Sequence, residues 1–432
     1  MPKKLRAKKQ TALRNSKTPP SKGIATKKKL PGKTQIAIGK KVDKTLETAM
    51  FYGFSPVATP RITKEDIVMA KAINENDSNV KSNKCTISLC PEEKIAVLRT
   101  YFETNMQTLP HPVALYFKGP IISHPITDEN EAKEKHVGLE IIGTTKSIAE
   151  AMVIKTACEI LHGEGYKELY VNINSVGDKD TMTRFTRELI AYFKKNVNAI
   201  HAPCRQSMKQ NIFEMFECRN EKCIALCEGA PKSISYLSEQ SRVHFKEVLE
   251  YLESLDIPFK IHNYLIGNKS FCTQTMFEIR DLNEKNEYSQ PLGVGLRYNT
   301  LAKKTGMKKD LPGIGISLNF KKLLKESDMV RPSTCTQKPK IYFIQLGFEA
   351  KLKSLQVIEL LRQAKIPICQ SLSKDKLTAQ IAQAENMKIP YTIIMGQKET
   401  MDNTVIFREM ATRSQDTIAI KDLATYIKKK NL

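Results

Sequence analysis

An α+β body followed by a smaller α/β domain is the fold class that this sequence predicts. Two runs of strand-forming residues, 113–117 and 137–142, flank a polar and charged loop, which is typical of a hairpin with a long tip. The side chains of residues 273–279 alternate with the period of two that a strand requires. From residue 340 onward, short strand patterns alternate with helix patterns, which predicts a compact α/β domain.

The composition is that of a chain with a sizeable core and two or three domains, since 41% of the 432 residues are hydrophobic. There is no run of about 18 or more apolar residues and no apolar signal core at the N-terminus, so we expect a cytoplasmic protein that does not associate with membranes. Ten cysteines without a regular framework fit a reducing compartment. The absence of tryptophan and an aromatic content of 7% argue against a surface that stacks nucleic-acid bases.

The charge is strongly positive and is concentrated at the N-terminus. The net charge is +23, and residues 1–42 carry 14 Lys or Arg and no acid, which leaves +9 for the rest of the chain. We interpret residues 1–42 as a disordered basic arm and expect a polyanionic partner, tRNA or another RNA, bound through counterion release. Two alternatives stay open: the arm is a nuclear or organellar address, or it only keeps the chain soluble. The basic residues of the arm that we expect to contact nucleic acid are Lys3, Lys4, Arg6, Lys8, Lys9, Lys27, Lys28 and Lys29.

The rest of the chain divides into two parts by composition. Residues 43–330 form the predicted body, which opens with a helix that Asp43 caps and contains a mostly helical insertion at about 185–256. A polar, proline-containing linker at 325–339 leads into the C-terminal domain, residues 340–432.

The sequence at 263–279 reads NYLIGNKSFCTQTMFEI, a turn followed by a strand. Its end, TQTMFE, is similar to the signature of histidyl-tRNA synthetases, a family of class II aminoacyl-tRNA synthetases. Further stretches resemble motifs of the same family: SLCPEE at 88–93, the hairpin of 109–143, INSVGD at 173–178 and GVGLRYNTL at 293–301. The resemblance covers the chain from residue 43 to residue 432.

This resemblance implies a fold, an activity and a set of contacts. It implies a class II synthetase-like core with an antiparallel sheet, a C-terminal anticodon-binding-like α/β domain and a homodimer. The family joins histidine to its tRNA at the expense of ATP. By this resemblance, Glu92 corresponds to the family's glutamate that binds the α-amino group of histidine. The other positions that the resemblance assigns to substrate binding are His136, Glu140, Arg297 and Tyr298.

Three positions depart from the family where its chemistry takes place. The arginines that hold the ATP phosphates in the family fall on Ser123, Gly267 and Lys322 in this chain. The planar guanidinium offers two aligned hydrogen bonds to phosphate oxygens, and neither serine, glycine nor lysine reproduces that geometry. The loss of one positioned donor costs about 10²–10³ in rate, so we predict that the ATP site is not catalytic. Lys118 and Lys269 are the nearby basic residues that would have to replace the missing charges.

We therefore expect a non-catalytic paralogue that binds RNA as a homodimer and requires no cofactor. One alternative is an active but divergent histidine–tRNA ligase, which would need ATP and magnesium. The other alternative is a regulatory partner subunit like the paralogue of this synthetase in histidine biosynthesis. That paralogue lacks an anticodon-binding domain, whereas residues 340–432 are present here.

The cysteines of the helical insertion do not predict a metal site. Thirteen, four and three residues separate successive cysteines, and this irregular spacing lacks the paired CxxC knuckles of a zinc motif. We expect free thiols. The weak candidates for metal ligands are Cys204, Cys218, Cys223 and Cys227, with His201 close by in the sequence.

Overall fold

The computed structural model describes residues 42–75, 91–119, 134–268, 270–284, 289–321, 323, 329–330, 339–371 and 374–430. The basic arm up to residue 41 lies outside this part of the chain. So do Ser123, Lys269 and Lys322, and the expectations for these residues stay predictions.

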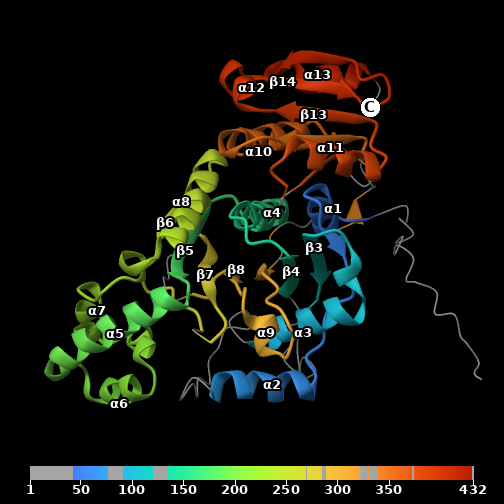
Figure 1. The fold of residues 1–432 in the computed structure, drawn as a ribbon. Helices are drawn as coiled ribbons and strands as arrows, with labels where there is room; N and C mark the ends of the chain where they lie inside the picture. The colour runs from blue at the N-terminus through green and yellow to red at the C-terminus, as the bar shows by residue number, and fades with distance from the viewer. Residues whose placement is uncertain are drawn as a thin grey trace, which may run out of the picture. The chain divides into compact units, whose positions relative to one another are not determined.

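The body is built around an eight-stranded sheet with the strand order β2-β3-β4-β9-β8-β7-β5-β6 (Figure 1). The pairings from β3 to β5 are all antiparallel, and the two pairings at the edges of the sheet are parallel. This confirms the predicted antiparallel core and the hairpin formed by β3 and β4. The strands are β2 Ser55–Pro56, β3 Val113–Lys118, β4 Glu134–Ile142, β5 Leu169–Gly177, β6 Phe259–Ile261, β7 Thr273–Asp281, β8 Gly293–Arg297 and β9 Gly313–Lys321.

One face of this sheet carries the main hydrophobic core. Ile314, Ile316 and Leu318 alternate along β9 and are buried on this face, as the period of two of a strand requires. The helices α1 (Lys44–Phe51), α4 (Ile148–Glu164) and α8 (Glu239–Ser254) belong to the same core. The residues between them on β9, Gly313, Gly315 and Ser317, therefore face the other side of the sheet.

That second face is covered by a different group of helices. α2 (Lys64–Glu75), α3 (Pro91–Glu103) and α9 (Leu301–Lys304) lie together below the sheet in Figure 1. They share a small hydrophobic core in which Ile95 and Leu98 of α3 lie with Met276 of β7 and Leu296 of β8. A 3-10 helix, Met106–Thr108, follows α3. Because α3 crosses this face, its polar side chains approach those of β4 and β9.

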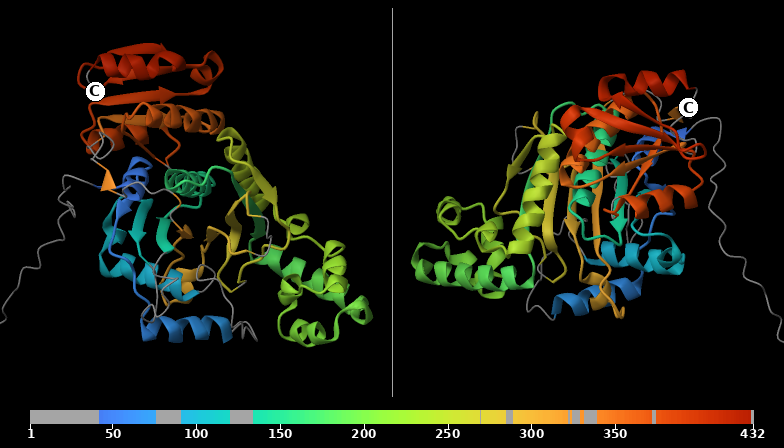
Figure 2. Two further views of the ribbon diagram at one scale, coloured as in Figure 1. Left: turned by 180° about the vertical axis from the view of Figure 1, so that it is seen from behind. Right: turned by 45° about the horizontal axis from the view of Figure 1, so that its top comes forward.

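A group of helices follows β5 and has a core of its own. The three views in Figures 1 and 2 show α5, α6 and α7 gathered beyond the β5 end of the sheet. Their core contains Phe185, Phe193, Ile212 and Cys223. The elements of this helical insertion are α5 Lys179–Lys195, α6 Ala202–Gln210 and α7 Glu221–Glu228, with 3-10 turns at Val197–Ala199, Ile212–Glu217 and Ser233–Tyr236.

The C-terminal domain is a five-stranded α/β unit with the strand order β12-β11-β13-β14-β15. The first three strands are parallel and the last two are antiparallel to their neighbours, which confirms the predicted α/β class. Its elements are β11 Ile341–Gln345, α10 Phe348–Gln363, β12 Ile368–Gln370, α11 Leu377–Asn386, β13 Tyr391–Met395, α12 Gln397–Asp402, β14 Thr404–Glu409, β15 Gln415–Ala419 and α13 Ile420–Lys429.

Two short features complete the described chain. β1 (Val42–Asp43) pairs antiparallel with β10 (Met329–Val330), so the two ends of the body meet. Across the described helices, none has the length and apolar character needed to cross a membrane.

Candidate functional site

The candidate site lies on the second face of the sheet, where β4 and β9 run side by side beneath α3. His136 and Glu140 of β4 point to this face, and in the sheet register Asn319 of β9 lies opposite His136 while Ser317 lies opposite Gly138, between the two. Gly315 pairs with Glu140, and a Cβ atom at position 315 would overlap the Glu140 carboxylate. Glycine at this position therefore allows the carboxylate to extend across the neighbouring strand.

A buried ionic network fills the centre of this site. The Lys94 ammonium lies 2.6 Å from Oε1 of Glu140 and 3.1 Å from Oε1 of Glu93, and all three side chains are at most 1% exposed. The Tyr298 hydroxyl donates to Oε2 of Glu140 at 2.7 Å, and the Ser317 hydroxyl donates to Glu93. Burial opposes the charged form of lysine, but the carboxylates of Glu140 and Glu93 raise the pKa of Lys94, so its ammonium stays protonated.

Several oxygen atoms around this network have no partner within the described part of the chain. They are Oε2 of Glu92, Oε2 of Glu93 and Oδ1 of Asn319, and each is shielded from solvent. Each is a hydrogen-bond acceptor, since ionised carboxylates only accept and Oδ1 is the carbonyl oxygen of an amide. An acceptor-rich cluster of this kind suits a ligand that brings N–H donors or positive charge.

Arg297 lies at the end of β8 and is fully buried. Its Nε donates to Oε1 of Glu150 at 2.6 Å, its Nη2 donates to Oε2 of the same carboxylate, and its Nη1 donates to the Thr144 carbonyl at 2.9 Å. His244 also contacts Glu150, at 2.7 Å. Burial opposes ionisation of Glu150, yet Arg297 and His244 lower the pKa of Glu150 to about 2. The guanidinium thus connects β8 to α4 and the segment before it.

Comparison with known proteins shows what this chain is similar to. Residues 340–430 match the family described as an anticodon binding domain. A histidine–tRNA ligase from Desulforamulus reducens is 26% identical over 396 residues, which cover 89% of this chain and 93% of the ligase. The chain is histidyl-tRNA synthetase-like.

Solved structures that resemble the chain carry related names. The apo histidyl-tRNA synthetase of S. aureus has a TM-score of 0.46 and 21% identity, covering 88% of this chain and 92% of its own. A protein from Bacillus halodurans named as an ATP phosphoribosyltransferase regulatory subunit/histidyl-tRNA synthetase has a TM-score of 0.41 and 15% identity, covering 82% of this chain and 90% of its own.

The structure shows where the positions assigned from the resemblance lie in this histidyl-tRNA synthetase-like chain. Glu140 and Tyr298 are bonded to each other, Glu92 is half-buried at the start of α3, and His136 is half-buried on β4. Arg297 lies next to Tyr298 in sequence, but its guanidinium is bonded to Glu150 on the far side.

Of the three positions where the resemblance places ATP-binding arginines, Gly267 is the one that the structure describes. It is buried, and a Cβ atom there would lie 2.5 Å from Sγ of Cys272 and 2.8 Å from Sδ of Met276. Both distances are shorter than van der Waals contact, so even an alanine would force these side chains to move. Sulfur-containing side chains occupy the place of the first side-chain atom at this position.

Two basic side chains near the altered positions, one close to Ser123 in sequence and one bonded to the loop after Gly267, already have partners. Lys118 pairs with Asp43, the residue that caps α1, and its side chain is 40% exposed. Lys304 donates to the Ser270 carbonyl in the loop after Gly267. Neither side chain is free to replace a missing guanidinium without giving up its present partner.

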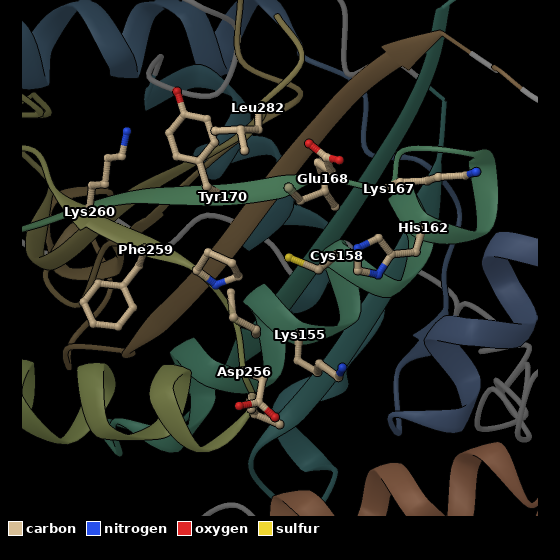
Figure 3. A pocket seen from close by; sticks show the side chains of 14 residues that line it. Lys155, Cys158, His162, Lys167, Glu168, Tyr170, Asp256, Phe259, Lys260 and Leu282 are labelled. Atoms are coloured by element: carbon tan, nitrogen blue, oxygen red, sulfur yellow. The ribbon is translucent and has the colours of Figure 1, made fainter.

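A cavity of about 470 Å³ lies elsewhere in the body, where the end of α4 meets β5 and β6 (Figure 3). Figure 3 shows Cys158 and His162 of α4 on one side of it and Tyr170 and Lys260 on another. The Lys260 ammonium lies 5.0 Å from the centre of the Tyr170 ring. None of the positions assigned to substrate binding lines this cavity.

The cysteines of the helical insertion separate into two kinds. The sulfur atoms of Cys204, Cys218 and Cys223 lie within 4.8 Å of one another. Cys227 is not part of this group, and its thiol donates to the Met215 carbonyl at 3.4 Å.

Sequence reasoning missed the residue at the centre of the site. Lys94 directly follows Glu92 and Glu93 in the sequence, and no motif marks it as a site residue. Its partner Glu140 is 46 residues away, and no local pattern connects the two. One local signal could have indicated the pair. Glu93 and Lys94 are charged residues that directly precede the apolar stretch Ile95–Leu98 of the same helix, where a buried charge needs a partner of opposite charge.

Proposed function

We propose that this histidyl-tRNA synthetase-like chain binds tRNA or another RNA and does not activate histidine. The observation that carries the proposal is the packing around Gly267, where Cys272 and Met276 fill the space next to the backbone. The position differs from the family by more than a charge, because buried, uncharged side chains already occupy the place of a Cβ atom.

The chemistry explains why this matters. Histidine activation transfers negative charge onto phosphate oxygens, and preorganised donors aimed at those oxygens supply the largest part of catalysis in such reactions. By sequence, Ser123 offers no charge and Lys322 offers a single point charge in place of a fork. With a packed glycine at position 267, all three places that would hold the phosphates are altered together.

The amino-acid pocket supports the same conclusion. In the site where the resemblance would place histidine, Lys94 already supplies an ammonium to Glu140 and Glu93. This internal cation neutralises part of the negative charge that would otherwise attract a basic ligand. The unpartnered Oε2 of Glu92 remains as an acceptor, so the pocket keeps one of its contacts.

Charge and domain content support RNA as the partner. The C-terminal domain matches an anticodon binding domain, and its last helix carries exposed lysines at 421, 428 and 429. The basic arm adds 14 further positive charges by sequence. Binding through such charges releases counterions from the nucleic acid, and the affinity then falls steeply with salt. A homodimer, as the resemblance implies, would present two copies of this surface.

A charging assay and a binding assay on the same preparation test the proposal. The full chain should retain labelled histidine tRNA on a filter at low salt and should not attach histidine to it in the presence of ATP and magnesium. An active histidine–tRNA ligase serves as the positive control for the tRNA. Histidyl-tRNA formation would refute the non-catalytic half of the proposal, and failure to retain any RNA would refute the other half.

Active aminoacylation is the second candidate function. It is favoured by the names of the curated relatives, which are histidine–tRNA ligases over about 90% of this chain, and by the presence of Glu92 and Glu140. In that case ATP and magnesium would be required. Lysines of the chain would then have to supply the phosphate contacts, and Lys118 would have to leave Asp43 to do so.

A further inference from the structure

The helical insertion brings together four side chains that are typical zinc ligands. Cys204 lies in α6, Cys218 follows the 3-10 turn Ile212–Glu217, and Cys223 lies in α7, so three separate elements contribute the thiols. The ring nitrogen Nδ1 of His201, just before α6, lies 3.7 Å from Sγ of Cys204. This convergence depends on how the helices pack and is not visible as a sequence motif.

The three sulfur atoms lie close enough to share one tetrahedral ion once Cys204 and Cys218 move slightly apart, and the His201 ring, which lies outside the group within 4.8 Å, would have to turn toward them. With Zn–S bonds of about 2.3 Å and Zn–N bonds of about 2.05 Å, tetrahedral ligands lie about 3.8 Å apart for two sulfurs and about 3.6 Å apart for a nitrogen and a sulfur. The three sulfur atoms lie within 4.8 Å of one another, and Cys204 and Cys218 are separated by 3.1 Å. The His201 to Cys204 distance of 3.7 Å matches the expected nitrogen–sulfur separation.

The backbone around the group favours thiolates. The His201 N–H points at Sγ of Cys223 and the Asn220 N–H points at Sγ of Cys218, both at 3.4 Å. Such N–H···S contacts stabilise the deprotonated sulfur, which is the form that binds a metal. Cys227 lies in the same helix as Cys223 and is also buried, but its thiol is the donor in its bond to the Met215 carbonyl. The fold thus distinguishes ligand-like cysteines from a cysteine that belongs to the core.

We propose that His201, Cys204, Cys218 and Cys223 bind a structural zinc ion that holds the helical insertion together. Three cysteines and one histidine form a closed tetrahedral set, and a closed set is the pattern of structural rather than catalytic zinc. On binding, the three thiols lose their protons to solvent and the neutral imidazole coordinates through Nδ1.

The size of the unit explains what the ion would do. The segment from α6 to α7 consists of short helices and 3-10 turns around a small core, and units of this size usually need a staple in addition to their apolar contacts. A zinc ion between α6, α7 and the turn between them would fix their mutual orientation. The site would be independent of the nucleotide and amino-acid pockets, so the inference holds whether or not the chain activates histidine.

The decisive experiment measures metal content in matched variants. The full chain is purified with a non-thiol reductant and without chelator, incubated with excess zinc and freed of unbound metal, and zinc is measured by inductively coupled plasma mass spectrometry. We expect about one zinc per chain for the unaltered protein and for Cys227→Ala. We expect less than about a tenth of that for Cys223→Ala and Cys204→Ser.

The Cys223→Ala and Cys227→Ala pair controls for folding, because both thiols are buried in the same helix and the same core. Cys204 is half-buried, so its replacement by serine disturbs the core less. Cobalt in place of zinc gives the second readout, since a tetrahedral thiolate site has a visible absorption band, and His201→Ala should change that band.

Three outcomes would overturn the proposal. The first is unaltered protein that retains no zinc. The second is loss of zinc in Cys227→Ala equal to that in Cys223→Ala. The third is a Cys204–Cys218 disulfide found by peptide mass mapping in protein purified without reductant and unable to take up zinc after reduction. An unchanged cobalt spectrum in His201→Ala would refute the histidine ligand.

Discussion

The buried pair of Arg297 and Glu150 allows a prediction whose size follows from the structure. Both side chains are 0% exposed, and the guanidinium bonds the carboxylate through two nitrogens. Replacing Glu150 by glutamine keeps the shape but removes the charge, and it places an amide donor opposite the donors of Arg297. The guanidinium would then be buried without a counterion.

The loss of stability expected for Glu150→Gln can be calculated in two ways, and both give about 3 kcal/mol. The pKa of Glu150 is lowered from an ordinary value of 4.5 to about 2, and at about 1.4 kcal/mol per pKa unit this corresponds to about 3 kcal/mol of stability. Breaking a buried pair by removing one partner costs about 3–5 kcal/mol in other proteins. We therefore expect Glu150→Gln to lower the free energy of unfolding by about 3 kcal/mol at neutral pH.

The pH dependence gives the same test a second dimension. Because the folded-state pKa of Glu150 is depressed, its contribution is present above pH 4.5 and is lost as the pH falls toward 2. The free energy of unfolding should therefore drop over this range by more in the unaltered protein than in Glu150→Gln.

Urea unfolding followed by circular dichroism measures both effects, and Glu103→Gln provides the matched control. Glu103 pairs with Arg99, but its side chain is 60% exposed, so the same substitution should cost at most about 1 kcal/mol. If Glu150→Gln is no more destabilising than Glu103→Gln, the account of Arg297 as a structural residue is wrong.

Three further predictions concern the pocket and the arm. Gly267→Ala should destabilise the chain by about 1–3 kcal/mol because its Cβ would overlap Cys272 and Met276. The control is Gly163→Ala in α4, where the nearest atom is Lys44 Cε at 3.6 Å, and this substitution should stabilise the chain by about 0.5–1 kcal/mol. Thermal unfolding compares the two variants, and equal melting temperatures would contradict the packing argument. Lys94→Met should cost about 3–5 kcal/mol in urea unfolding because it leaves Glu93 and Glu140 buried without a cation, and a neutral result would show that the network does not depend on that charge. Deleting residues 1–41 should make the affinity for tRNA in filter binding less dependent on salt, because each phosphate contact contributes about 0.7–0.9 to the slope of log affinity against log salt concentration. An unchanged slope would exclude the arm from RNA binding.

The strands of the site could be predicted from the sequence because their patterns are local. The strand-forming runs at 113–117 and 137–142 and the alternation at 273–279 predict β3, β4 and β7, whereas the motif at 293–301 did not predict the strand β8 that the structure shows there. The strand–helix alternation after residue 340 likewise predicted the C-terminal domain. Periodicity reports which residues face a common side, and that information is complete within a few residues.

The contacts within the site could not be predicted because they join distant segments. Lys94 meets Glu140 across 46 residues and Arg297 meets Glu150 across 147 residues, so their partners depend on the strand order and on where α3 and α4 cross the sheet. The same reason explains the cysteines, whose irregular spacing predicted no metal site. Helix packing, and not a knuckle in the sequence, brings Cys204, Cys218 and Cys223 together.

The central claim is that the nucleotide site does not support activation of histidine, and ATP–pyrophosphate exchange tests it most directly because it measures the activation step without tRNA. With histidine, ATP and magnesium at saturating concentrations, we predict an exchange rate at least about 10³-fold below that of an active histidine–tRNA ligase, and equal to the rate measured without histidine. Histidine-dependent exchange within about tenfold of the active enzyme would contradict the account, because it would mean that other side chains hold the phosphates in place of the missing arginines.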